Sequence, residues 1–290
     1  MTPSEMLTLL GYRLEDPNGD VYDNTLKILM INRAQNRVYT ELNPHVVPEL
    51  QSVESNLALD ETGAFDSSAL SNTVLGGISG GVYDVKDATD NNFTRKLSFD
   101  EYKAYINRDY TYSTDNPHRY ILGTKQYYLP FTATLLENTD AFASGSYYYI
   151  KTFQAGDDFV NVGGANASGT RFLCTTSADA TTFTTSVVYL VHGVNVYYKK
   201  QPTQITVANY ATQSFTVENE NVHDAIAFYA ESLLWGVNND PRKGDALQEA
   251  SSLIETLNTT ITATDSNSID DKEYLDYDSE YSLPLSSWEI

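Results

Sequence analysis

The side chains best suited to chemistry in this sequence are four histidines, a single cysteine and one pair of adjacent aspartates. The histidines are scattered, and none has the spacing of a metal-binding motif such as His-Glu-x-x-His. One of them, His223, lies beside Asp224 at the expected start of a helix, where capping or packing is its simplest role. The set comprises His45, His118, His192 and His223. This scatter predicts no metal site.

The pair Asp157 and Asp158 could supply one of the carboxylates that a glycoside hydrolase uses as acid and base. Acidic residues are abundant, with 39 Asp and Glu in 290 residues, so this hydrolase hypothesis is the least favoured. Cys174 has no activating context, and the chain contains neither a Gly-x-Ser-x-Gly motif nor a dinucleotide fingerprint. The sequence therefore predicts no enzyme activity and no cofactor.

Two further stretches could hold a phosphate or a cation. The paired glycines at 76–77 and 80–81 lack the Gly-Lys-Ser/Thr of a phosphate-binding loop, so we expect a turn or flexible loop there. Residues 87–92 carry several oxygen ligands but lack the longer spacing and distal glutamate of a calcium loop. We therefore expect a solvated loop at 87–92.

The composition narrows the class of protein. The chain has no long apolar run and no signal peptide at its start, so no membrane segment is expected, and its one cysteine suits a reducing compartment. Its net charge of −21 argues against a surface that grips the nucleic acid backbone. The charge fits either simple solubility or a surface that should not adhere to DNA. Most of the 22 tyrosines are expected to pack in strands and cores, with interfaces as the alternative.

The elements that must position these residues begin with helices at the N-terminus. Thr2-Pro3-Ser4-Glu5 fits a capping box, which predicts a short amphipathic helix after it. Asp23 or Asn24 is expected to cap a longer helix, which Pro44 ends because proline lacks the amide donor. The apolar stripe of that longer helix repeats every four residues, at Leu26, Met30, Ala34, Val38 and Leu42.

The C-terminal part predicts a strand followed by a helical hairpin. The strand includes Tyr197 and ends at Lys199, Lys200 and Pro202. Asp240 followed by Pro241 reads as an N-cap with proline at the first position of the second helix. The core-facing positions expected on the two helices are Ile226, Tyr229, Leu233, Leu247 and Ile254.

The middle of the chain shows strand patterns. Apolar and polar residues alternate after Leu50, Ser98 with Glu101 favours a short capped helix, and two strands joined at 123–125 predict a hairpin. We predict an α+β fold: a helical bundle built from N- and C-terminal helices, with a large β-rich insertion and an extended C-terminal tail. The expected parts are 1–44, N-terminal helices; 45–131, β-rich with a short helix; 132–196, an inserted small β module; 197–262, strand and helical hairpin; and 263–290, an acidic tail.

The order of these segments resembles the head–tail adaptor, or connector, proteins of tailed bacteriophages. The matching pieces are MLTLLGYRLED and VVPELQSVESNLAL near the start, LSFDEYKAYINR and HRYILGTKQYYLPF in the middle, and NVHDAIAFYAESLLW and DPRKGDALQEASSLIETL near the end. Residues 147–183 also resemble a small β module of phage virion proteins, although Gly156-Asp157-Asp158-Phe159 lacks one spacer residue of that pattern.

This resemblance implies a structural virion protein located at the head–tail junction and assembled in the host cytoplasm. Such adaptors form a ring, usually of about twelve copies, that joins the portal protein to tail or nozzle proteins. The ring extends a channel through which DNA passes without sequence-specific binding, and a closed cyclic ring is the geometry that such a channel requires. By analogy, the tail would dock on the portal through Leu283, Leu285, Trp288 and Ile290.

A second hypothesis is a binding module, in which the inserted β unit recognises a glycan or another virion protein on the virion surface. Aromatic β units can bind sugars by stacking, and residues 132–196 are rich in tyrosine and phenylalanine.

Overall fold

The structure is a computed structural model, and it describes residues 1–90, 92–107, 117–129, 131–138, 140–176 and 183–265. These residues form six α-helices and eleven strands in three sheets. The chain divides into two compact units. The helical unit comprises Met1–Pro48 and the chain from Gln204 on, and the strand unit comprises Glu49–Thr203.

The helical unit begins with α1 (Pro3–Arg13) and α2 (Asn24–Glu41). The predicted capping box is confirmed, because Thr2 Oγ1 accepts from the amide of Glu5 while Glu5 Oε2 accepts from the amide of Thr2. Asp23 Oδ1 caps α2 by accepting from the amide of Leu26 at 2.7 Å. Helix α2 ends at Glu41, shortly before Pro44. This end was expected, because proline has no amide hydrogen to donate within a helix.

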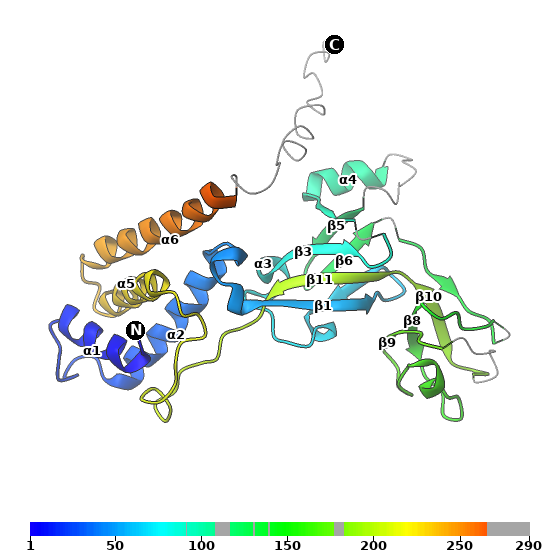
Figure 1. The fold of residues 1–290 in the computed structure, drawn as a ribbon, viewed down its shortest axis with the longest axis horizontal. Helices are drawn as coiled ribbons and strands as arrows, with labels where there is room; N and C mark the ends of the chain where they lie inside the picture. The colour runs from blue at the N-terminus through cyan, green and yellow to red at the C-terminus, as the bar shows by residue number, and fades with distance from the viewer. Residues whose placement is uncertain (91, 108–116, 130, 139, 177–182, 266–290) are drawn as a thin grey trace, which may run out of the picture. The chain divides into compact units, whose positions relative to one another are not determined.

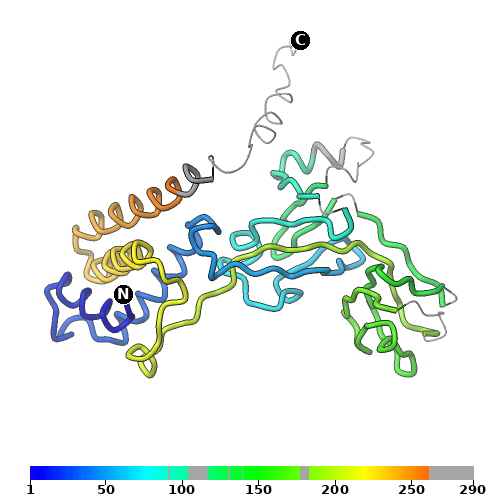
Figure 2. The backbone as a smooth tube through the Cα atoms, in the orientation of Figure 1, coloured from blue at the N-terminus to red at the C-terminus, as the bar shows by residue number. Residues whose placement is uncertain are grey.

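Two helices from the other end of the sequence complete this unit. Helix α5 (Glu220–Val237) packs against α2, α1 and α6 (Lys243–Asp265), so that segments far apart in the sequence lie together (Figures 1 and 2). Helix α6 starts two residues later than predicted. Asp240 Oδ1 accepts from the amide of Arg242 and thereby organises the turn that precedes the helix.

The strand unit contains three sheets. The first has the order β1-β11-β3 and is antiparallel, with β1 (Gln51–Ala58), β11 (Gly193–Lys199) and β3 (Val82–Asp87). The second has the order β2-β6-β5-β4, with β2 (Ala64–Asp66), β6 (Lys125–Leu129), β5 (His118–Leu122) and β4 (Arg95–Lys96). Strands β5 and β6 form the predicted hairpin, and β4 runs parallel to β5.

The third sheet has the order β7-β10-β8-β9. Its strands are β7 (Thr134–Leu135), β10 (Val187–Val191), β8 (Tyr147–Thr152) and β9 (Thr170–Leu173). Two helices belong to the strand unit, α3 (Gly77–Gly81) and α4 (Phe99–Asn107). Ser98 and Glu101 bond each other's backbone amide at the start of α4, which confirms the predicted capping box.

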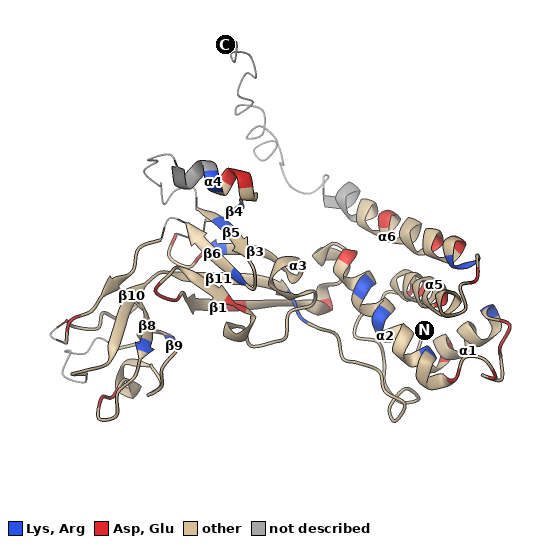
Figure 3. Cartoon of the chain, turned by 180° about the vertical axis from the view of Figure 1, so that it is seen from behind, with Lys and Arg blue, Asp and Glu red and all other residues tan. Residues whose placement is uncertain are grey.

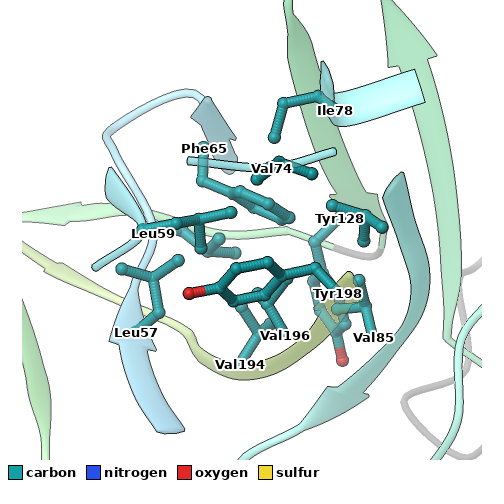
Figure 4. Packing of buried hydrophobic residues seen from close by; sticks show 12 residues of the cluster. Leu57, Leu59, Phe65, Val74, Ile78, Val85, Tyr128, Val194, Val196 and Tyr198 are labelled. Carbon is teal, nitrogen blue, oxygen red and sulfur yellow. The ribbon is translucent and has the colours of Figure 1, made fainter. Parts of the chain in front are cut away.

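Each part of the strand unit has its own hydrophobic core. The first two sheets and α3 enclose a cluster in which side chains of β1, β3, β6 and β11 converge around Tyr198 (Figure 4). The third sheet has a separate aromatic core that includes Phe142, Tyr148 and Phe159. A smaller cluster around Ala58, Tyr147 and Val191 joins the third sheet to the first. Because these clusters bury large apolar side chains, the strand unit is stabilised from within.

The predicted fold class is therefore wrong. The chain is a mixed α/β protein in which strands predominate, and not a helical bundle that carries a β-rich insertion. The strands between Glu49 and Thr203 form the larger compact unit, since they bury hydrophobic cores of their own. The expected turn at 76–81 is also incorrect in part, because Gly77–Gly81 forms a short helix.

Candidate functional site

The apolar positions expected on the helices differ in burial. Met30, Ala34 and Val38 are buried on α2, and so are Ile226 on α5 and Ile254 on α6. The side chains of Leu26, Tyr229 and Leu233 are half-buried, whereas Leu247 is 42% exposed. On α6 the buried positions are Ala246, Ala250 and Ile254. The predicted docking residues Leu283, Leu285, Trp288 and Ile290 lie outside the described residues.

The connection between α1 and α2 is organised by a buried carboxylate. Asp16 accepts hydrogen bonds from the amides of Asp20 and Tyr22, and it lies 3.7 Å from the buried ammonium of Lys27. The amide of Tyr22, followed by other backbone amides and Lys27, holds the pKa of Asp16 below its usual value. This arrangement fixes the loop that carries Val21 and Tyr22.

That loop meets the turn between α5 and α6. The Tyr22 ring packs edge-on against Trp235 with centroids 6.4 Å apart, and Asn238 donates to the Tyr22 hydroxyl at 2.7 Å. The guanidinium of Arg242 lies 3.6 Å from the centre of the Trp235 ring, and it also pairs with Glu15. These contacts hold the two connections together at one end of the helical unit.

Three apolar side chains remain exposed beside this network. Tyr12 is 70% exposed, Val21 64% and Val237 53%, although each lies within three residues of a member of the network. We call Tyr12, Val21, Val237 and Arg242, the last of which stacks on the buried Trp235, the loop-end surface. Its exposed tyrosine and arginine are residue types that contribute strongly to binding energy at protein interfaces.

The four histidines have separate environments. His45 is exposed, His118 is half-buried, and the half-buried ring of His192 lies near the rings of Tyr128 and Phe131. His223 is buried, with Nε2 2.7 Å from the carbonyl of Val217 and Nδ1 3.3 Å from the N-terminal amine. Across the described ranges, no group of three or more His, Cys, Asp or Glu side chains could hold a metal ion.

Asp157 and Asp158 both organise loops. Buried Asp157 accepts from the amides of Thr184, Thr185 and Ser186, which ties the chain before β10 to the loop after β8. Asp158 accepts from the amide of Val160 and the side chain of Asn166. Cys174 is buried and donates to the carbonyl of Thr176.

The aspartate that begins the 87–92 stretch is also structural. Asp87 accepts from the amides of Thr89 and Asp90, and its second oxygen accepts from the buried hydroxyl of Tyr128 at 2.5 Å. Burial and this hydrogen bond raise the pKa of Tyr128. Asp87 therefore both shapes the turn after β3 and links the first sheet to the second.

A polar pocket of about 480 Å³ lies within the strand unit and is lined by residues of β1, β8 and β9 together with Ser68 and Ala69. A β-bulge between Glu54 and Leu57 shapes one wall, and Asn56 adopts a left-handed conformation there with φ of 58°. Tyr149 and Arg171, from the third sheet, also line it. Sequence reasoning missed this pocket, although three consecutive polar residues at 54–56 interrupt the apolar–polar alternation and could have indicated a bulge.

Arg171 connects the walls of this pocket. Its Nη1 donates to the carbonyls of Ala58 and Ala64, at 3.4 and 3.0 Å, and its Nη2 lies 3.7 Å from Asp60. Asp60 also pairs with Lys125 at 3.2 Å. Burial raises the pKa of Asp60, but hydrogen bonds from Thr62 and Ala64 outweigh it and leave the pKa below its usual value. Arg171 is therefore a fixed, charge-compensated element of the site.

Within the part of the chain that the structure describes, no helix combines the length and apolar character needed to cross a bilayer. The geometry thus presents two candidate sites, the loop-end surface of the helical unit and the polar pocket of the strand unit. Comparison with models of known protein families and with curated proteins gave no match for this chain.

Proposed function

We propose that this protein is a structural virion component that forms an oligomeric ring, joins the portal to the tail and extends the DNA channel. The loop-end surface is the observation that carries this proposal. Its exposed Tyr12, Val21 and Val237 each lie within three residues of the network in which Arg242 stacks on Trp235, on a well-capped helical unit. A closed ring of identical subunits needs such a surface on every copy, because each subunit contacts a neighbour on either side.

The charge distribution supports passage of DNA past the helical unit. Among its described residues, 1–48 and 204–265, this unit contains six Lys and Arg but 15 Asp and Glu. Acidic side chains outnumber basic ones on α5 and α6, whereas α2 carries mainly basic ones and ends at the acidic Glu41 (Figure 3). A surface with an excess of negative charge repels the DNA backbone, so DNA could move along it without being held.

Oligomeric state tests the ring. Native mass spectrometry and electron microscopy of the purified full-length protein, alone and with the portal protein, should show a closed ring of about twelve subunits. The variants Tyr12→Asp and Val237→Asp place a charge on the loop-end surface without removing a buried contact, so they should shift the population to monomers. A matched control is Val160→Asp, at a position 64% exposed in the strand unit.

Attachment to the portal tests the role of the tail. Deleting residues 266–290 leaves every helix described here in place and should abolish binding to the portal in pull-down and sedimentation experiments. Undiminished portal binding by this truncated protein would contradict the docking role of the tail. A protein that stays monomeric with the portal present would contradict the proposed ring as a whole.

A further inference from the structure

The polar pocket offers several hydrogen-bonding groups that no other described residue uses. Neither the Ser55 nor the Tyr149 hydroxyl has a hydrogen bond to a described residue. Glu54 accepts from the amide of Ser71 through Oε2, which leaves Oε1 available. Asn56 uses its side-chain oxygen to accept from Tyr147, so its amide nitrogen can still donate.

Hydrogen bonds to neighbouring residues hold two of the residues that line the pocket, Asn56 and Arg171, in place. The backbone amide of Asn56 donates to Asn195 Oδ1 at 2.8 Å, and the Tyr147 hydroxyl donates to Asn56 Oδ1 at 2.8 Å. Arg171 is anchored to the carbonyls of Ala58 and Ala64. Because Asn56 and Arg171 are already held in place, this part of the pocket would lose little conformational entropy on binding a ligand.

The charges of the pocket favour a neutral ligand. Arg171 lies near Asp60, and its guanidinium centre is 5.5 Å from that of the Tyr149 ring, whereas the carboxylate of Glu54 lies on the β1 side. An anionic ligand would therefore meet Glu54, and a cationic ligand would meet Arg171. A ligand whose groups both donate and accept hydrogen bonds can satisfy the two sides together.

We propose that this pocket is a binding site for a neutral saccharide. Vicinal hydroxyls of a sugar can donate to the Glu54 carboxylate and accept from the Asn56 amide, while Ser55 and Tyr149 provide further hydroxyl partners. The Tyr149 ring supplies apolar surface for the C–H face of the sugar. A volume of about 480 Å³ lies within the range of small-ligand sites, about 300–1,000 Å³. This inference is independent of ring formation.

Saturation-transfer NMR and calorimetric titration of the full-length protein test the site. The probes are lactose, maltose, cellobiose and N,N′-diacetylchitobiose, with 3′-sialyllactose as the charged counterpart of lactose. At least one neutral sugar should bind. Ser55→Trp, at an exposed position without side-chain hydrogen bonds to described residues, should fill the pocket and weaken that binding at least about tenfold.

Two further variants separate the site from general effects. Glu54→Gln keeps an acceptor for the Ser71 amide but removes the charge, so it should weaken binding of the neutral sugar while the protein stays folded. Asn161→Trp adds the same bulk at an exposed position outside the pocket and should bind like the unmodified protein. The proposal is overturned if no neutral sugar binds, if Ser55→Trp binds unchanged, or if 3′-sialyllactose binds more tightly than lactose.

Discussion

The Tyr147 hydroxyl donates a hydrogen bond to Asn56 Oδ1 at 2.8 Å, and the Tyr147 ring covers Gly193 of β11, the strand that pairs with β1. This contact joins the third sheet to the bulge of β1 in the first. Together with Ala58 and Val191, it forms a core that belongs to both sheets. A fragment containing only residues 132–196 would therefore expose part of this core, and full-length protein is the proper material for binding experiments.

Gly193→Ala tests the close approach of Tyr147. A Cβ atom at Gly193 would lie 2.3 Å from the Tyr147 ring, so the ring must move and the joint between the sheets must open. We expect a loss of about 1–3 kcal/mol in the free energy of unfolding, the usual cost of overpacking. Urea denaturation of the two proteins gives this difference.

Gly236→Ala is the matched control for that change. Gly236 lies in α5 with no atom within 4 Å of its added methyl group, and alanine is the better helix former. The free energy of unfolding of this variant should rise by up to about 0.5–1 kcal/mol. Equal stability of Gly193→Ala and the unmodified protein would show that the ring can move aside at no cost.

Tyr128→Phe tests the link between the first and second sheets. The change removes the hydroxyl that donates to buried Asp87 and leaves the carboxylate with its two amide donors. Hydrogen bonds to charged groups contribute about 1.5–3 kcal/mol, so a loss of that size is expected in the free energy of unfolding. Tyr127→Phe, at the half-buried neighbouring position, should have little effect, and equal losses in both variants would contradict this account.

Asp157→Asn tests the carboxylate that ties two loops together. Burial acts to raise the pKa of Asp157, but hydrogen bonds from Ser186, Thr184 and Thr185 outweigh it and lower the pKa to about 2. This pKa lies below the pKa of about 3.9 that an aspartate has in the unfolded chain. The carboxylate therefore stabilises the fold fully above about pH 4, and this stabilisation is lost as the pH falls toward 2.

The free energy of unfolding of the asparagine variant should therefore be lower by about 1–3 kcal/mol near neutral pH. The reason is that asparagine offers one acceptor oxygen where the carboxylate offers two. Its difference from the unmodified protein should shrink in acid, as measured by denaturation at a series of pH values. Glu137→Gln, at an exposed position of the strand unit, should show no such trend. A difference that stays constant down to pH 2 would argue against a carboxylate role.

His223 gives the helical unit its own acid sensitivity. Burial, and to a smaller extent the N-terminal amine, lower the pKa of His223 in the folded state. The imidazole therefore binds a proton more readily in the unfolded chain, where its pKa is about 6.5. The free energy of unfolding is greatest above this pH and falls as the pH drops below it. Thermal unfolding between pH 7.5 and 5.5 should show this fall in the unmodified protein.

His223→Gln should lower the melting temperature at neutral pH but flatten its dependence on pH across this window. Its side-chain amide can still donate toward the carbonyl of Val217, but it has no proton to gain. His45→Gln is the control, because His45 is exposed and should leave the pH dependence unchanged. The same slope in His223→Gln would assign the acid sensitivity to other groups.

The sequence predicted local structure better than long-range pairing. The capping residues Thr2, Asp23 and Ser98 act within three or four positions, so their patterns could be recognised without knowledge of the fold. The pairing of β1 with β11 joins Gln51 to Lys199, and no local pattern specifies such a partner. That gap explains why the strand unit was mistaken for an insertion.

The candidate sites were harder to predict for the same reason. The polar pocket depends on Asn56 and Arg171, which are distant in sequence and meet only after the sheets have assembled. Polar residues that complete a buried network, such as Asp16 with Lys27, also look like ordinary surface residues in the sequence. On α6 the predicted Ile254 is buried, but Ala246 takes the buried position expected of its neighbour Leu247, because the packing partner of the helix cannot be read from its own sequence.

The packing of α2 against α5 has a consequence for synthesis of the protein. Helix α2 ends at Glu41 and α5 begins at Glu220, so the ribosome must translate the whole strand unit before α2 can meet its partner. At about 5–20 residues per second, this interval lasts roughly 10–35 seconds. During that time the side of α2 that packs against α5 lacks its cover, which makes the nascent chain a natural client for chaperones.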